Sequence, residues 1–366
     1  MKITVVTPLY AIAGVPLAQI RFAKCLSARG HDVELIFGRV VEQYKLPEIS
    51  GLKVINLNCR NVRGMFVPLL RYMKSAKPDI VFSAEDHLNA IILLAAIVAQ
   101  SNSYISCSSR VTPFDTYSNK PFSKRWFLKI LMRSVMWRAN VLTCVSIDMV
   151  AQYRRIFNNT KHTCVYNIVA DVNFHTRAAE SVEHPWFKNR SFPVLIAAGR
   201  LAPWKGFADL INAISIVNSF RTVRLLILGD GPLRNELQSQ IKSLNLGDKV
   251  QLIGYVDNPL KYFSRSDIFV LSSHVEGLPN VLVEAMMCGC TPVATDCPTG
   301  PREVLNGGQY GYLVPPRDSQ AMASSILKAI DNRISDELLN QAVRPFQEDV
   351  VIARHFDLLF SPSYRS

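Results

Sequence analysis

Residues 267–297 read DIFVLSSHVEGLPNVLVEAMMCGCTPVATDC and predict a strand, a helix and a second strand. The apolar run DIFVLSS indicates the first strand, and TPVATDC indicates the second. Pro279 is expected at the first position of the helix, where its missing N–H is not needed. A strand–helix–strand unit of this kind is typical of a parallel sheet with helices on its faces.

Two glutamates lie eight positions apart in this unit. Glu276 follows the first strand on a turn, next to Gly277, which lets the backbone approach a ligand closely. Glu284 lies inside the helix. The free N–H groups and the dipole of a helix N-terminus suit a diphosphate, and carboxylates suit hydroxyl groups. A nucleotide sugar carries both kinds of group; two glutamates at chance spacing are the alternative interpretation.

The same alternation of strands and helices extends through the whole chain, with early helices expected at about residues 16–29 and 87–100. The predicted strands are ITVVTPLY, DVELIFG, KVINLN, PDIVFSA, SYISCSSR, NVLTCVS and HTCVYNIV in the first half, and VLIAAGR, RLLILGDG, VQLIGYV, DIFVLSS, TPVATDC and GYLVPP in the second. This pattern predicts an α/β fold with two Rossmann-like doubly wound domains facing each other across a cleft. Ligands of such domains bind at the carboxyl ends of the strands.

The alternating pattern also predicts the domain boundaries. Residues 1–170 form the first domain, which we expect to bind the acceptor and to face the membrane, and a polar connector follows at residues 171–192. Residues 193–345 form the second domain, which we expect to bind the nucleotide sugar. The last segment, residues 346–366, has apolar side chains at helical spacing and no strand after it. We therefore expect a C-terminal helix that packs back on the first domain.

Length and composition exclude several classes of protein. With 366 residues and 49% hydrophobic side chains, the chain can bury two cores. Its longest apolar run, residues 88–99, is too short to span a bilayer. The N-terminus lacks the features of a signal peptide, and the eight cysteines form no paired C-x-x-C motif. We therefore expect reduced thiols and a cytoplasmic protein.

The net charge of +12 lies almost entirely in the first half of the chain. Residues 1–186 contain 23 Lys and Arg against 12 Asp and Glu, whereas residues 187–366 contain 18 against 17. A basic first half indicates that its partner is a nucleic acid, an anionic membrane surface or an acidic substrate.

Two cations follow the first strand of the second domain. Arg200 and Lys205, in GRLAPWKGF, would project from the end of that strand across a turn. Arginine binds phosphate oxygens bidentately and lysine supplies a mobile point charge, although two solvated surface cations are the alternative. Tyr255 and Val256, in IGYVDN, follow a later strand, where a nucleobase could lie against ring and backbone.

The second half of the chain resembles the retaining glycosyltransferases of family four, which have the two-domain GT-B fold. The matching segments, in the family's order, are GRLAPWKGF, LGDGP, GYVDN, EGLPNVLVEAMMCG, TDCPTGPREVL and GYLVPP, and they span nearly all of residues 193–316. The first half matches more loosely, through YAIAGVPLAQIRFAKCLSARGHDVEL, PDIVFSA, ANVLTCVS and CVYNIV. The E-x7-E spacing with Arg and Lys upstream is a fairly specific signature. TDCPTGPREVL is most similar to members that transfer a sugar from a UDP donor to a lipid-linked acceptor.

The resemblance implies a role for each site residue. Arg200 and Lys205 would hold the donor diphosphate and stabilise the charge that builds up on it as the glycosyl bond breaks. Glu276 would contact hydroxyl groups of the transferred sugar, and Glu284 would accept hydrogen bonds from the ribose. Gly14, after the first strand, would let that loop approach the phosphates. The sugar pocket would be lined by N–H groups near Gly277, Leu278, Pro279 and Asn280.

The resemblance also implies how the reaction proceeds. No Asp-x-Asp occurs in the chain, so we expect no carboxylate-held Mg²⁺ and no cofactor besides the UDP-sugar that serves as donor. The two cations would do the work of the metal. Transfer would retain the anomeric configuration by a same-face route, in which a leaving phosphate oxygen takes the proton of the acceptor.

The first half departs from the commoner pattern of the family. The dipeptide Ala13-Gly14 replaces a paired glycine, and Ser109-Arg110 stands at the end of SYISCSSR, where many members have a histidine. Glu85, Asp86 and His87 follow another predicted strand. They are candidates for an acid, a base or an acceptor contact, or they cap a helix at the surface. The sequence does not identify a catalytic base.

One basic segment of the first half has the composition of a helix at a membrane interface. In PFSKRWFLKILMRSVMWR, Arg125, Lys129 and Arg133 recur at every fourth position, with Trp126 and Trp137 beside them. Cations next to tryptophans and aliphatic side chains are typical of a helix lying in the surface of an anionic membrane. An ordinary surface helix and a nucleic-acid-binding face are the alternatives, but no stacking or recognition motif supports nucleic acid.

Together these features predict a glycosyltransferase that moves an N-acetylhexosamine or a hexose from UDP to a polyprenyl-diphosphate-linked glycan. We expect it to be attached peripherally to the inner face of the cell membrane and not to bind nucleic acid. A nucleotide-sugar epimerase on the same scaffold is one alternative. A non-enzymatic relative that binds membranes or nucleic acid is another, although the complete set of Arg200, Lys205, Glu276 and Glu284 argues against it.

Overall fold

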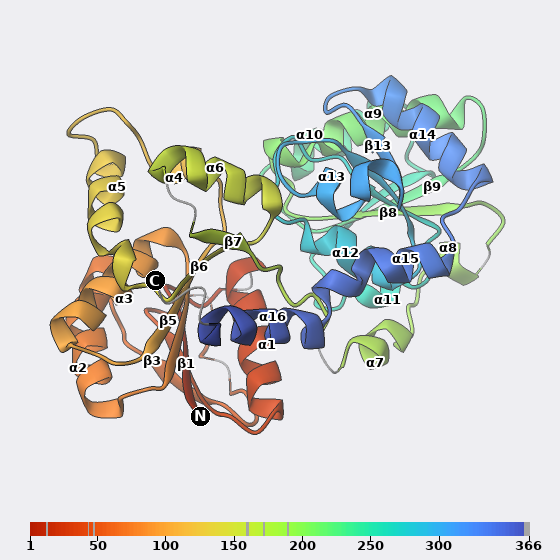
Figure 1. The fold of residues 1–366 in the computed structure, drawn as a ribbon. Helices are drawn as coiled ribbons and strands as arrows, with labels where there is room; N and C mark the ends of the chain where they lie inside the picture. The colour runs from red at the N-terminus through yellow and green to blue at the C-terminus, as the bar shows by residue number, and fades with distance from the viewer. Residues whose placement is uncertain are drawn as a thin grey trace. The chain divides into compact units, whose positions relative to one another are not determined.

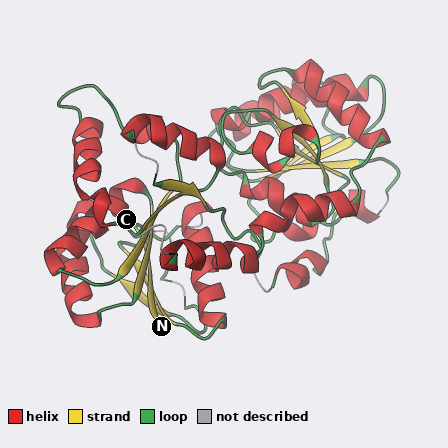
Figure 2. Cartoon of the chain, in the orientation of Figure 1, coloured by secondary structure: helices red, strands yellow, loops and turns green. Residues whose placement is uncertain are grey.

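The computed structural model of the chain describes residues 1–11, 14–42, 44–46, 48–158, 161–170, 173–188 and 190–361. The chain divides into two compact units, residues 1–171 with 347–366 and residues 172–346. Each unit is built on one parallel β-sheet with helices on both faces (Figure 1, Figure 2). The prediction of an α/β fold with two Rossmann-like domains is therefore confirmed.

The described part of the first unit contains a seven-stranded sheet of order β3-β2-β1-β4-β5-β6-β7, and all neighbouring strands are parallel. The strand order changes direction between β1 and β4, which is where sheets of this kind bind ligands. The strands are β1 (Lys2–Thr7), β2 (Asp32–Phe37), β3 (Lys53–Asn56), β4 (Ile80–Ala84), β5 (Tyr104–Ser109), β6 (Val141–Cys144) and β7 (His162–Cys164).

Helices cover both faces of this sheet. α2, α3 and α5 pack together on one face, and α1 and α16 lie on the other (Figure 1). The helices are α1 (Gly14–Ala28), α2 (Phe66–Ala76), α3 (Asp86–Ala99), α4 (Pro113–Thr116), α5 (Lys124–Val135), α6 (Ile147–Phe157) and α16 (Glu348–Phe360), with the 3₁₀ turns η1 (Val62–Met65) and η2 (Met136–Arg138). Within the described ranges of the chain, no helix has the length and apolar character needed to cross a bilayer.

The C-terminal helix α16 completes the core of the first unit. Its apolar side, which includes Val351 and Leu358, is buried against α1 and the strands β1 and β2. Near its start, Glu348 forms an ion pair with Arg29, with 3.3 Å between Oε1 and Nε. His355 is 7% exposed, and burial together with the nearby positive charge of Arg110 lowers its pKa from 6.5 to about 3. The folded protein therefore holds this imidazole in its neutral form.

We expect acid to destabilise the first unit through His355. Because the folded pKa lies below the unfolded value, the stabilisation is complete above pH 6.5 and is lost as the pH falls towards 3. The full effect on the free energy of unfolding is on the order of 5 kcal/mol. Replacing His355 with Phe removes the titrating group, so the loss of stability between pH 7 and pH 4, measured by urea denaturation, should be smaller in this variant. An equal loss in both proteins would contradict this assignment.

The second unit, in its described residues, contains a six-stranded parallel sheet of order β10-β9-β8-β11-β12-β13. Counted from β8, this is the order 3-2-1-4-5-6 of Rossmann sheets, and the direction changes between β8 and β11. The strands are β8 (Val194–Ala198), β9 (Arg224–Leu228), β10 (Val250–Gly254), β11 (Ile268–Leu271), β12 (Thr291–Thr295) and β13 (Tyr312–Val314).

Helices α9, α10 and α14 bury their apolar sides on one face of this sheet, and α11, α12 and α15 lie together on the other (Figure 1). The helices are α7 (Phe174–Ala179), α8 (Pro185–Lys188), α9 (Phe207–Asn218), α10 (Arg234–Ser243), α11 (Leu260–Phe263), α12 (Asn280–Met287), α13 (Pro301–Val304), α14 (Ser319–Asp331) and α15 (Asp336–Val343). The 3₁₀ turns are η3 (Pro203–Lys205), η4 (Asn306–Gly308) and η5 (Arg344–Phe346).

Two sequence predictions need correction. Residues 171–192 were expected to be a polar connector, but α7 and α8 form there and belong to the second unit. Phe174 in α7 and Trp186 in α8 are buried, with 3% and 7% of their surface exposed. The two helices are too short to show a periodic apolar pattern in the sequence. Pro279 precedes α12 as its N-cap residue instead of occupying the first helical position, because its ψ of 78° is not helical.

Candidate functional site

Lys205 and Glu276 form an ion pair at the carboxyl edge of the second sheet. Lys205 ends η3, which follows β8, and Glu276 lies in the loop between β11 and α12. Lys205 Nζ donates to Glu276 Oε1 at 2.6 Å, and the two side chains are 19% and 11% exposed. Ser273 Oγ donates to the same oxygen at 2.6 Å. Oε2 of Glu276 has no hydrogen bond to any residue that the structure describes, so it is available to a ligand.

Hydrogen bonds between the two loops position this pair. Ser272 Oγ donates to the carbonyl oxygen of Lys205 at 2.8 Å, and the His274 N–H donates to that of Trp204 at 2.8 Å. The His274 ring reaches α9, where its Nε2 lies 2.7 Å from Asp209 Oδ2. The cation and the carboxylate are therefore held by their loops and not by two flexible side chains alone, as a pre-organised site requires.

Gly206 allows the two loops to approach each other. Its φ is +62°, and a Cβ at this position would lie 2.0 Å from the carbonyl oxygen of Ser272. Only glycine adopts this conformation without strain and leaves room for the neighbouring backbone. The glycine after Lys205 in GRLAPWKGF is thus required by packing against the loop that carries Glu276.

Replacing Gly206 with Ala should destabilise the second unit by at least about 2 kcal/mol, since it combines left-handed strain with a backbone clash. It should also disrupt the ion pair of the site, because the loops that carry Lys205 and Glu276 must separate. Gly247→Ala is the matched control, since a Cβ there would meet nothing within 4 Å. Urea denaturation measures the stability change; similar values for the two variants would show that the close approach is wrong.

The loop after β12 supports the Glu276 loop from another direction. Thr299 Oγ1 donates to the carbonyl oxygen of Glu276, and Thr299 itself has a φ of +64°. A Cβ at Gly300 would lie 2.5 Å from the carbonyl oxygen of Gly277. Strained backbone of this kind persists where the surrounding structure holds it, commonly at binding loops. The segment TDCPTGP therefore shapes the site by holding its loop.

The remaining predicted donor-binding side chains lie on elements of the same sheet edge. Arg200 follows β8 after Gly199; it is exposed and makes no hydrogen bond or ion pair to any described residue. Glu284 lies in α12 and is 9% exposed. Tyr255 and Val256 follow β10, where Tyr255 is 57% exposed and Val256 is half-buried. The structure thus brings Lys205 and Glu276 into contact and leaves Arg200 free to meet a ligand.

The N–H groups before α12 are only partly available. The Asn280 N–H donates to the carbonyl oxygen of Leu278 at 2.9 Å, so it is engaged within its own loop. Pro279 has no N–H to offer. The N–H groups of Gly277 and Leu278 have no acceptor within the described ranges of the chain. Two of the four predicted positions can therefore donate to a ligand.

Gly14 does not show the close approach expected of it within its own unit. It begins α1, is exposed, and a Cβ there would meet nothing within 4 Å. Its neighbour Ala13 lies outside the described residues. The role of Gly14 at a donor diphosphate remains a prediction.

Two cysteines near the glutamates are neutral thiols. Burial, and then the charge of Glu276, raise the pKa of Cys297 to about 11. Burial, and then the charge of Glu284, raise the pKa of Cys288 to about 12. Neither thiol ionises at neutral pH, so neither is a nucleophile in this site.

The acidic residues after β4 have two different environments. Asp86 is 2% exposed and accepts hydrogen bonds from Tyr153 at 2.5 Å and from Ser109 at 2.7 Å. It is therefore a buried structural group that joins α3, α6 and β5, not a surface cap. Glu85 is half-buried with a φ of 82°, and burial raises its pKa to about 7. His87 is exposed.

The predicted membrane-binding residues lie on α5 and on η2. Arg125, Arg133 and Trp137 are exposed, whereas Trp126 and Lys129 are half-buried. Lys129 is covered because its Nζ donates to Asn119 Oδ1 at 2.6 Å, which ties α5 to the loop before it. Lys129 is therefore less available to a membrane than the fourfold spacing suggested.

Large apolar side chains are exposed beside these cations. Phe122, Phe127, Ile130 and Trp137 are 83%, 55%, 45% and 65% exposed. The opposite side of α5, with Met132 and Val135, is buried. We call the exposed side the α5 surface; it consists of Phe122, Arg125, Phe127, Ile130, Arg133 and Trp137. Such a cluster of aromatic side chains and arginines marks an interaction surface.

Sequence reasoning missed Ser273, His274 and Thr299, which hold the Glu276 loop. Each follows a strand of the second sheet within a few residues, which is the criterion that found Arg200 and Glu276. No motif or pattern in the sequence distinguishes these side chains as site residues. The sequence also does not indicate the positive φ of Thr299.

Comparisons with known proteins show the family of the chain. A family model described as glycosyl transferases group 1 matches residues 180–345. An uncharacterised glycosyltransferase of Methanocaldococcus jannaschii is 33% identical over 305 residues, which are 74% of this chain and 73% of that protein. The chain belongs to the glycosyl transferases group 1.

This glycosyltransferase is also similar to a further relative and to a solved structure. A relative from Campylobacter jejuni, N-acetylgalactosamine-N,N'-diacetylbacillosaminyl-diphospho-undecaprenol 4-alpha-N-acetylgalactosaminyltransferase, is 32% identical over 332 residues, 90% of this chain and 81% of that protein. The crystal structure of HepE from Anabaena in complex with UDP covers 99% of this glycosyltransferase and 100% of its own chain, with a TM-score of 0.76 and 18% identity. The fold is therefore that of the GT-B glycosyltransferases.

Proposed function

We propose that this glycosyltransferase is a retaining, family-four enzyme that moves an N-acetylhexosamine or a hexose from a UDP-sugar to a polyprenyl-diphosphate-linked glycan. The observation that carries the proposal is the ion pair of Lys205 and Glu276, with Arg200 exposed and unpaired among the described residues in the loop that leads from β8 to Lys205. A cation for the diphosphate and a carboxylate for the sugar are what a sugar nucleotide needs.

The donor site is proposed on the second unit. Arg200 and Lys205 bind the diphosphate, and Glu276 uses Oε2 to accept a hydrogen bond from a hydroxyl of the sugar. Glu284 accepts from the ribose, and Tyr255 and Val256 contact the base. The UDP in the structure of HepE, whose fold this chain shares, supports a uridine nucleotide as donor.

The acceptor is proposed from the relatives. The Campylobacter jejuni relative is named for transfer to a sugar linked through diphosphate to undecaprenol, and it aligns with 90% of this chain. The α5 surface adds a physical argument, because its arginines and aromatic side chains suit the interface of an anionic membrane. We therefore place the enzyme on the cytoplasmic face of the membrane that holds its acceptor.

The reaction proceeds at the anomeric carbon of the donor. The bond from this carbon to the β-phosphate oxygen breaks, and a bond to the acceptor hydroxyl forms on the same face. The acceptor proton passes to an oxygen of the departing phosphate, so UDP leaves and no base from the protein is needed. Fixed positive charge from Arg200 and Lys205 stabilises the diphosphate as its charge grows. The E-x7-E spacing of Glu276 and Glu284 supports retention.

Transfer should continue in the presence of EDTA. Arg200 and Lys205 supply the positive charge that a metal ion would otherwise provide at the diphosphate. The initial rate of UDP release is measured with and without EDTA, at about 5 mM to remove Mg²⁺. The two rates should differ less than about twofold. A loss of activity that Mg²⁺ restores would overturn the metal-independent mechanism.

The function is tested by incubating the purified protein with UDP-sugars and a prenyl-diphosphate-linked glycan. We expect UDP release that depends on the acceptor, and a glycosidic bond whose anomeric configuration, measured by NMR, equals that of the donor. Inversion would contradict the retaining mechanism. Isomerisation of the UDP-sugar without an acceptor would instead show an epimerase.

A further inference from the structure

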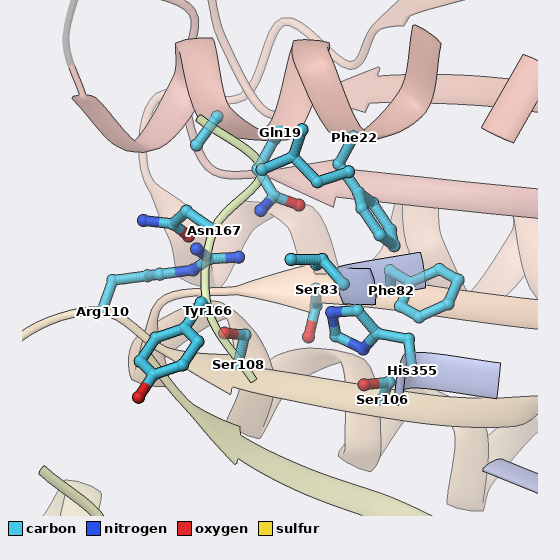
Figure 3. A pocket seen from close by; sticks show the side chains of 13 residues that line it. Gln19, Phe22, Phe82, Ser83, Ser106, Ser108, Arg110, Tyr166, Asn167 and His355 are labelled. Atoms are coloured by element: carbon cyan, nitrogen blue, oxygen red, sulfur yellow. The ribbon is translucent and has the colours of Figure 1, made fainter. Parts of the chain in front are cut away.

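A polar pocket lies inside the first unit, at the carboxyl ends of β4 and β5 (Figure 3). Helices α1 and α16 cover it, through Gln19 and His355 among others. Its volume is about 340 Å³, counting the part that is open to solvent. The strands contribute the hydroxyl groups of Ser83, Ser106 and Ser108. The proposed donor site, on the second unit, makes no use of this pocket.

Arg110 brings a positive charge to the pocket. It directly follows β5, and Figure 3 shows its side chain extending towards Asn167. The side chain is half-buried as a whole, but its Nε is fully covered and has no hydrogen-bond partner within the described ranges. A covered Nε–H without a hydrogen-bond acceptor is costly, and a bound anion that accepts from it removes that cost.

Glu85 does not neutralise this arginine. Its negative charge favours the charged form of Arg110, yet burial still lowers the pKa of Arg110 to about 10. No ion pair within 4.0 Å joins the two side chains in the part of the chain that the structure describes. Burial also raises the pKa of Glu85 to about 7, so its carboxyl group is only partly ionised at neutral pH. The pocket therefore keeps a positive potential.

Neutral polar groups surround the charge. Gln19 is 2% exposed, Ser108 is 5% exposed and His355 is 7% exposed. Nδ1 of His355 is buried and has no hydrogen-bond partner among the described residues. Figure 3 shows the His355 ring and the Gln19 amide on the side of the pocket formed by the two helices. Buried amide, hydroxyl and imidazole groups of this kind donate hydrogen bonds to an anion without adding charge.

We propose that this pocket binds a small anionic group, a carboxylate or a phosphoryl group, with Arg110 as its charged ligand and Gln19, Ser108 and His355 as neutral donors. Because His355 belongs to α16, the bound anion also ties the last helix to the sheet. The group is either a free anion or part of the diphosphate of a lipid-linked acceptor.

The site is tested by thermal unfolding of the full chain in increasing inorganic phosphate at constant ionic strength. The parent protein carries Arg200→Ala and Lys205→Ala, so that phosphate binding at the proposed donor site does not contribute to the measured stabilisation. The result therefore does not depend on whether the donor site is assigned correctly. The rise of the unfolding midpoint gives the Kd. Arg110→Gln should raise this Kd at least about tenfold. Arg155→Gln, which removes an exposed arginine of α6, should leave it unchanged.

Glu85→Gln should change the Kd for inorganic phosphate in the opposite direction from Arg110→Gln. Removing its partial negative charge should lower the Kd for inorganic phosphate, and this test remains available if Arg110→Gln does not fold. The proposal is overturned if phosphate does not stabilise the parent, if Arg110→Gln binds it equally well, or if Glu85→Gln binds it more weakly.

Two diphosphates distinguish the sources of the anion. Farnesyl diphosphate carries the prenyl group of a lipid acceptor, and inorganic pyrophosphate does not. Stabilisation that depends on Arg110 and is stronger with farnesyl diphosphate supports an acceptor site. Stabilisation that depends on Arg110 and is no stronger with farnesyl diphosphate supports a site for a free anion.

Discussion

Replacing Lys205 with Ala should lower kcat/KM for sugar transfer at least about a hundredfold, with most of the loss in kcat. Lys205 is proposed to stabilise charge that appears on the diphosphate only as the glycosyl bond breaks, and removing one such fixed group costs about 10²–10³ in rate. The variant also leaves Glu276, which is 11% exposed, with Ser273 as its remaining side-chain donor among the described residues. Initial rates at varied UDP-sugar concentration separate kcat from KM.

Glu276→Ala should cause a loss of similar size, and the double variant should lose less than the product of the two single effects. The two side chains are in contact at 2.6 Å, and contacting residues are not additive. Lys242→Ala, which removes an exposed lysine of α10, is the matched control. Rates for Lys205→Ala and Glu276→Ala that stay within about twofold of the wild type would show that the site is misassigned.

Reversing the charge of Arg125, Lys129 and Arg133 to Glu should weaken binding to anionic vesicles at least about a hundredfold. Each cation near an anionic surface contributes about 1 kcal/mol, and each reversal also adds repulsion. We expect Arg125 and Arg133 to account for most of the effect, since Lys129 is held by Asn119. Sedimentation with vesicles of varied anionic lipid content measures the partition coefficient.

The control for this experiment changes the same amount of charge elsewhere on the first unit. Lys24, Arg60 and Arg155 are exposed and lie outside the α5 surface. Their replacement by Glu should reduce vesicle binding far less. Equal losses in the two triple variants would mean that net charge alone drives binding, and undiminished binding of the α5 variant would refute the membrane surface. Replacing Phe127 and Ile130 with Ser tests the apolar part.

The fold was largely predictable because its strands are short apolar runs bounded by turn residues. Every segment predicted as a strand contains one in the structure. The ends were less predictable: HTCVYNIV suggested a long strand, but β7 covers only His162–Cys164, and the residues after it leave the sheet. Residues 171–192 were misjudged because Phe174 and Trp186 are buried by contacts distant in sequence, which no local pattern reveals.

The candidate site was predictable in its residues but not in its contacts. Position after a strand identified Arg200, Lys205 and Glu276, since parallel strands deliver their carboxyl ends to one edge. The contact between Lys205 and Glu276 joins residues 71 positions apart. It depends on Ser272, whose side chain bonds the other loop, and on Gly206, whose missing Cβ makes room. These are features of packing, and a spacing rule cannot show them.

The most direct test of the account is a crystal structure of this glycosyltransferase with UDP bound. We expect the β-phosphate oxygens within hydrogen-bonding distance of Arg200 and Lys205, and the ribose hydroxyls on Glu284. A UDP molecule bound elsewhere, with Lys205 still engaged only by Glu276, would contradict the proposed donor site.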